Sequence, residues 1–308
     1  MRILALHGLG SSSSLLKEQL RPFIQELGPN CQFIFLEGAV TCGRGPAEHC
    51  LNSGATLGQP PFYSHATGFS PAEVCQTFQR IDKFVEENGP FDGVLGFSLG
   101  AALAMSYILH KQRTRPHANL PFYFATLFSP IFVASADETL YGGIVDRLLD
   151  DEHTAFRSAF PSEDFLSTLK TQDERIFADY TRVVLSMNST VGNVLPGKPA
   201  PTGFFEEANG VQAASIPRML HPKLTKDRIG IPTVVVTGVK EAGAISEQSR
   251  VAQGLCRASL RWKYQHDGGH DVPFKRSDVQ EIVSFMMEAI EEGRELSSLH
   301  EYEATANL

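Results

Sequence analysis

The stretch Gly93-Val94-Leu95-Gly96-Phe97-Ser98-Leu99-Gly100-Ala101 decides how this chain is expected to fold. Its first residues are apolar and predict a short buried strand, and the alanine-rich residues 101–111 predict a helix. Between them lies the pattern G-x-S-x-G, which places a serine on a sharp turn from strand to helix. Such a turn lifts the serine hydroxyl above the sheet, and Ser98 is therefore the candidate nucleophile. The plainer alternative is an ordinary Gly-Ser turn that caps a helix.

Predicted strands and helices alternate on both sides of this turn. The strands are expected at residues 2–6, 32–36, 93–95, 122–128, 233–237 and 260–265, and the helices at 11–27, 70–88, 101–111, 246–256 and 277–291. Pro22 is expected to kink the first helix or split it in two, and Ser70 with Glu73 forms a capping box. Residues 38–69 are rich in Gly, Pro, Cys and Ser and predict a long loop. The alternation is typical of an α/β fold, a mostly parallel sheet with helices on both faces.

The alternation lapses from about residue 131 to 228, where helical pieces and a loop rich in Gly and Pro occur. We therefore expect one α/β domain over residues 1–292, with a cap or lid inserted at about 131–228 and packed over the top of the sheet. Residues 293–308 are expected to form a frayed polar C-terminal tail.

A serine hydroxyl needs a base to take its proton, and in this kind of sheet the base follows the last strand. Two histidines do so, in the segment His266-Asp267-Gly268-Gly269-His270. The glycine pair makes a loop that could present His270 above the sheet, so His270 is the expected general base. The alternative, a metal site made of both histidines, needs a helix that the glycine pair opposes.

The third member of a triad is an acid, expected after the penultimate strand. The loop that follows residues 233–237 contains no Asp but has Glu241, which could orient the histidine ring as an Asp does. The alternative is that Glu241 lies on the surface and that Asp267 or Asp271 serves as the acid.

An oxyanion hole needs two backbone N–H donors. The Leu99 N–H is one candidate, and the other comes from the early loop His7-Gly8-Leu9-Gly10, where the Leu9 N–H is expected to serve. His7 itself is expected to be structural, because this fold places its base late in the chain.

The composition excludes several classes of protein. The formal net charge is −8 and the pI about 5.7, which argues against a nucleic-acid partner. The five cysteines have no CxxC spacing and indicate unpaired thiols in a reducing compartment. The N-terminal apolar run is too short for a signal peptide, and no apolar stretch is long enough to span a membrane. A cytoplasmic location without membrane association is expected.

Five segments resemble the fungal "family of serine hydrolases", which includes animal esterases linked to an ovarian-tumour gene. They are LHGLG at residues 6–10, FLEG at 35–38, GPFDGVLGFSLGA at 89–101, the run from Ile231 to Gly238, and HDGGHDVP at 266–273. The resemblance implies an α/β-hydrolase fold. This chain departs from the family at two positions, since Leu99 stands where Gln is usual and Glu241 where Asp is usual.

Many fungal members of that family act in polyketide pathways, so the resemblance implies a thioesterase that releases an acyl chain from the carrier domain of a synthase. We therefore expect hydrolysis of an acyl ester or thioester, with no metal or organic cofactor. Six phenylalanines of the insertion are compatible with an apolar lid or with a second core: Phe156, Phe160, Phe165, Phe177, Phe204 and Phe205. A general carboxylesterase of small esters and a catalytically silent binding protein are the alternatives.

Overall fold

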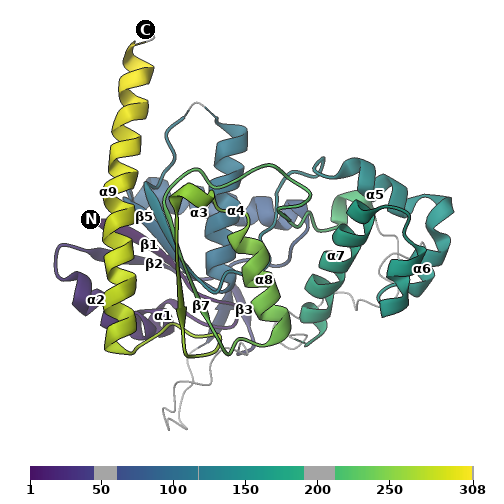
Figure 1. Ribbon diagram of the computed structural model, residues 1–308, viewed down its shortest axis with the longest axis horizontal. Coiled ribbons are helices and arrows are strands. Elements are labelled where there is room, and N and C mark those ends of the chain that lie inside the picture. Colours follow the sequence, from purple (N-terminus) through teal and green to yellow (C-terminus); the bar gives the residue numbers. More distant parts are fainter. Residues whose placement is uncertain (45–60, 117, 191–211, 307–308) are drawn as a thin grey trace.

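The protein is described here by a computed structural model that covers residues 1–44, 61–116, 118–190 and 212–306 (Figure 1). Its centre is a six-stranded sheet in the order β2-β1-β5-β6-β7-β8. All five neighbouring pairs in this sheet are parallel. The strands are β1 (Arg2–Leu6), β2 (Gln32–Leu36), β5 (Gly93–Phe97), β6 (Phe124–Phe128), β7 (Thr233–Gly238) and β8 (Arg261–His266).

Helices cover both faces of the sheet, as Figure 1 shows. On one face lie α3 (Pro71–Asn88), α4 (Leu99–Thr114) and α8 (Gly243–Gln253), whose apolar residues join one buried cluster. On the other face lie α1 (Ser13–Gln19), α2 (Arg21–Leu27) and α9 (Arg276–Ala306), which share a second cluster. Because helices cover the sheet on both sides, β5 and β6 are buried along their whole length. The α/β-hydrolase fold expected from the sequence is confirmed.

Two local expectations about helices are also confirmed. The helix predicted at residues 11–27 is split in two, with Pro22 in the first turn of α2, where a missing N–H costs nothing. Helix α3 begins with the predicted capping box, in which Ser70 and Glu73 each bond the other's backbone.

Two other expectations are wrong. The loop predicted at residues 38–69 contains an antiparallel pair, β3 (Val40–Cys42) with β4 (Phe62–Ser64). The frayed tail predicted from residue 293 is instead the continuation of α9, which stays helical to residue 306 and stands clear of the body in Figure 1. The segment after residue 293 contains several Glu and Leu residues, which favour a helix, so α9 continues beyond the part that contacts the sheet.

Five helical segments follow β6 before the undescribed residues 191–211. They are α5 (Gly142–Leu149), the 3₁₀ turns η1 (Asp151–His153) and η2 (Glu163–Thr168), α6 (Thr154–Ala159) and α7 (Gln172–Thr190), and the short η4 (Ala213–Ser215) follows later. In Figure 1, α5, α6 and α7 form a group beside the sheet, at the end of the long axis away from α9. That the insertion at about 131–228 forms a cap or lid over the top of the sheet stays a prediction.

The inserted segment has a hydrophobic core of its own. Phe156, Phe160 and Phe177 are each at most 2% exposed and pack there with Val145 and Leu148. Of the two interpretations left open by the sequence, these three rings fit a second core and not the lining of an acyl site. The side chain of Phe165 and all of Phe204 and Phe205 lie outside the described residues.

Among the residues that the structure describes, no helix combines the length and the apolar character needed to cross a bilayer.

Candidate active site

Ser98 stands on the sharp turn between β5 and α4. Its φ of 54° and ψ of −116° lie outside the regions that L-residues usually adopt. The backbone is held there because the Ser98 N–H donates to the Phe128 carbonyl at 2.8 Å, at the end of the neighbouring strand. Strain kept in place by its surroundings is characteristic of functional turns.

The two glycines of the turn are required by space. A Cβ on Gly96 would lie 2.4 Å from the Ala101 nitrogen, and one on Gly100 would lie 2.1 Å from the Leu6 carbonyl oxygen. Both distances are too short for any side chain, so only glycine fits at these two positions.

His270 is the histidine that the fold brings to this serine. Its Nε2 lies 2.9 Å from Ser98 Oγ, a hydrogen-bonding distance across 172 residues of sequence. Its ring also packs against Phe97, with the ring centroids 5.2 Å apart. The imidazole can therefore take the hydroxyl proton of Ser98, which is what a general base must do.

Backbone contacts hold the loops after β7 and β8 together. Val239 and Lys240 donate to the carbonyls of His266 and Gly268, both at 2.9 Å. A Cβ on Gly238 would lie 2.0 Å from the Gly269 carbonyl oxygen, so only glycine permits this approach. These contacts bring the loop that carries Glu241 against the loop that carries His270.

Glu241 lies beside the far edge of the His270 ring. Its Oε1 is 3.6 Å from His270 Nδ1, too long for a hydrogen bond but close enough for a strong charge interaction, and its side chain is 1% exposed. Burial acts to raise the pKa of Glu241, but its contacts with His270 and the Ser129 hydroxyl outweigh burial and leave the pKa below its ordinary value. The carboxylate is therefore charged at neutral pH.

Ser129 is a site residue that the sequence analysis missed. It is fully buried directly after β6, has a φ of 47°, and its hydroxyl donates to Glu241 Oε1. No local pattern in the sequence marks it, because the strand order of the sheet is what places the end of β6 beside the ends of β5 and β7.

His266 and Asp267, two of the alternatives to His270 and Glu241, have other surroundings. His266 is 4% exposed, and its Nδ1 accepts from the Gly268 N–H at 3.1 Å. The His266 ring therefore stabilises the turn that follows β8. The side chain of Asp267 is 90% exposed and lies 4.0 Å from Lys275. Asp271 is partly exposed in the same loop. No group of three His, Cys, Asp or Glu side chains among the described residues could hold a metal ion.

The two N–H groups predicted to hold the oxyanion belong to residues that lie near Ser98. Leu99 is the first residue of α4, and Leu9 follows Gly8, where an added Cβ would lie 3.4 Å from Ser98 Cβ. Neither N–H donates to a backbone carbonyl within the described segments. The N-terminus of α4 also directs its positive end at the same place.

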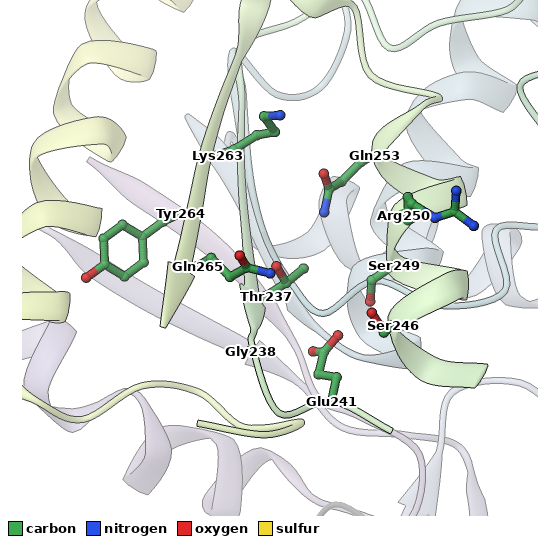
Figure 2. Close-up of a pocket in the computed structure, with 10 residues that line it drawn as sticks. All are labelled: Thr237, Gly238, Glu241, Ser246, Ser249, Arg250, Gln253, Lys263, Tyr264 and Gln265. Atoms are coloured by element: carbon green, nitrogen blue, oxygen red, sulfur yellow. The ribbon is translucent and has the colours of Figure 1, made fainter. Parts of the chain in front are cut away.

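A polar pocket of about 380 Å³ lies next to Glu241, between α8 and strand β8. Figure 2 shows the Glu241 carboxylate directed toward Ser246 and Ser249, with Lys263 and Gln253 at the end away from Glu241. The lining is hydrophilic, so this pocket is not suited to an acyl chain.

Comparisons with known proteins find esterases and hydrolases among the relatives of this chain. Esterase alnB of Emericella nidulans is 34% identical over 279 residues, which cover 91% of this chain and 93% of the relative. Hydrolase FUB4 of Fusarium oxysporum f. sp. lycopersici is 25% identical over 290 residues, which cover 94% and 98%. Among solved structures, esterase RhEst1 from Rhodococcus sp. ECU1013 matches with a TM-score of 0.48 at 14% identity, covering 94% of this chain and 91% of that one.

The family comparison extends over most of the chain. A model of the serine hydrolase (FSH1) family matches residues 1–282, a span that contains Ser98, Glu241 and His270. With its serine on a strained turn and a histidine in hydrogen-bonding reach, this chain belongs to the FSH1 family of serine hydrolases.

Proposed function

We propose that Ser98, His270 and Glu241 form a catalytic triad that hydrolyses an acyl ester or thioester. The observation that carries the proposal is the 2.9 Å contact between His270 Nε2 and Ser98 Oγ at a strained strand-to-helix turn. The buried carboxylate of Glu241 beside the same ring supports the third role.

In the first half of the reaction, Ser98 Oγ attacks the acyl carbon while His270 Nε2 takes its proton. The carbonyl oxygen becomes an oxyanion, to which the Leu99 and Leu9 N–H groups donate. The intermediate then collapses, and the imidazolium gives its proton to the departing alcohol or thiol. The acyl group remains as an ester on Ser98.

In the second half, His270 takes a proton from water, and the resulting hydroxide equivalent attacks the acyl ester. Collapse returns the proton to Ser98 Oγ and releases the carboxylic acid. Glu241 stabilises the imidazolium in both halves through its charge. A movement of less than about 1 Å would turn its 3.6 Å contact with Nδ1 into a hydrogen bond.

We further propose that the substrate is an acyl thioester on the carrier domain of a polyketide synthase. The resemblance of five core segments to a family active in polyketide pathways supports this substrate. The phenylalanines of the insertion do not support this substrate, because Phe156, Phe160 and Phe177 pack in the separate core of the insertion. The name of esterase alnB favours the second candidate, a carboxylesterase of oxygen esters.

The chemistry is tested with Ser98→Ala. Loss of the nucleophile costs about six powers of ten in kcat in a well-studied triad, so turnover should fall to background while the fold is kept. Wild-type protein should be labelled at Ser98 by a fluorophosphonate, and the Ala variant should not. A correctly folded variant with near-normal turnover would contradict the proposed function.

The substrate is tested by comparing kcat/KM for matched thioesters and oxygen esters, each free and loaded on a carrier domain. The N–H donors contact only the carbonyl oxygen, so any preference must come from binding beyond the reacting carbon. Burial of the acyl chain at about 0.8 kcal/mol per CH₂ would give a steep dependence on chain length. Equal values across the set, with acetyl esters the best substrates, would favour the carboxylesterase.

A further inference from the structure

His7 lies next to the active site and takes no part in the proton transfers proposed above. It follows β1, its side chain is fully buried, and both ring nitrogens have partners. The Gly38 N–H donates to Nε2 at 2.9 Å, and Nδ1 lies 2.7 Å from the carbonyl oxygen of Gly8. His7 therefore connects the loop after β2 to the loop that holds Leu9.

These two contacts determine where the ring carries its proton. A backbone N–H can only donate, so Nε2 must accept from Gly38 and has no proton. A neutral imidazole with a bare Nε2 carries its proton on Nδ1, and Nδ1–H therefore donates to the Gly8 carbonyl. Glu37 Oε1 also lies 3.1 Å from Nε2, at the edge of the ring away from the Gly8 contact.

The Gly8 carbonyl and the Leu9 N–H belong to one peptide plane. In a trans peptide the two groups point in opposite directions, and fixing one fixes the other. Gly8 lies against Ser98, as the 3.4 Å approach of an added Cβ shows. Glycine also offers little resistance to rotation of this plane, because its backbone has the widest choice of conformations.

We propose that His7 is a positioning residue of the oxyanion hole: by holding the Gly8 carbonyl from behind, it keeps the Leu9 N–H directed at the reacting carbonyl oxygen. The inference rests on the proposed function, in which Leu9 donates to the oxyanion. Rotation of this one peptide plane would cost the transition state a donor and leave ground-state binding almost unchanged.

Two substitutions separate the two contacts of the ring. His7→Asn can place an amide N–H where Nδ1 lies and keep the bond to Gly8, but it loses the acceptor for Gly38. His7→Gln can place its amide oxygen near Nε2 and keep the bond to Gly38, but it loses the donor to Gly8. A purely structural His7 would make the Asn variant at least as defective as the Gln variant.

We expect His7→Gln to lower kcat by about 10²-fold with KM within about threefold, since losing one oxyanion donor costs 10²–10³ in kcat. His7→Asn should keep kcat within about tenfold of wild type. Inhibition by a trifluoromethyl ketone, which forms an oxyanion on Ser98, should weaken across the variants in proportion to kcat/KM. Equal kcat in both variants, or a larger loss in Asn, would overturn the inference.

A measurement on the unmodified protein covers the case in which a variant does not fold. The ¹⁵N shifts of the His7 ring should show a protonated Nδ1 and, in the neutral form, a bare Nε2. A proton on Nε2 alone would overturn the inference. Fluorophosphonate labelling of Ser98 is the separate check of the proposed function, so wild-type kcat in both variants together with intact labelling would reject the role of His7 alone.

Discussion

Replacing Glu241 tests the distance between the acid and the base. The charge on Glu241 Oε1 lies 3.6 Å from His270 Nδ1. At an effective dielectric constant of 20, it stabilises the imidazolium by about 4.6 kcal/mol, or roughly three powers of ten in rate. Glu241→Gln removes the charge and should lower kcat by about that factor.

Glu241→Asp keeps the charge but shortens the side chain by one methylene. If the carboxylate retreats by about 1.5 Å, the same estimate falls to about 3.3 kcal/mol, which is about a tenfold loss in kcat. The expected order is therefore wild type, then Asp, then Gln, although Asp is the residue usual in the family. Steady-state kinetics on a soluble ester, with melting temperatures to verify folding, measures it.

Asp267→Asn is the matched control, because its side chain is 90% exposed and it lies in the histidine loop. It should leave kcat within about twofold, since exposed charges contribute little. A larger loss in Asp267→Asn than in Glu241→Gln would refute the assignment of the acid. Full activity in Glu241→Asp would refute the reasoning from distance.

Three further predictions follow from the packing and charges. Gly100→Ala should abolish activity or folding, because the added Cβ would lie 2.1 Å from the Leu6 carbonyl oxygen. Gly243→Ala is the control: Gly243 has open space around it, so the free energy of unfolding should change by less than about 1 kcal/mol in thermal unfolding. Phe156→Ala should lower the unfolding free energy by about 3–5 kcal/mol in urea titrations while KM for a small ester stays constant, because the ring packs in the separate core of the insertion. Since the folded pKa of Glu241 lies below its ordinary value, its ionised form stabilises the fold above about pH 4.5, and this contribution is lost as the pH falls through the folded pKa. Wild type should thus lose stability more steeply than Glu241→Gln between about pH 5 and 3, and parallel curves in acid-unfolding titrations would contradict the lowered pKa.

The motifs of the site could be found in the sequence because each depends on local chemistry. The turn around Ser98 requires glycine at two positions where backbone atoms leave no space for a Cβ, and this requirement appears in the sequence as the pattern G-x-S-x-G. The glycine pair before His270 indicated a loop after the last strand for a similar reason. Ser129 has no such pattern, because it contacts Glu241 only through the adjacency of two strands.

By itself the sequence determined the alternation of strands and helices, the split at Pro22 and the candidate residues Ser98, His270 and Glu241, since these depend on periodicity, backbone restriction and order along the chain. Only the tertiary structure decided which groups meet. It brought Ser98 and His270 together across 172 residues, placed the Ser129 hydroxyl on Glu241, and gave three phenylalanines of the insertion a core of their own. Contacts of this kind depend on strand order and on the packing of whole faces of the sheet. Every residue of the sheet contributes to that packing, so no local sequence pattern predicts the contacts.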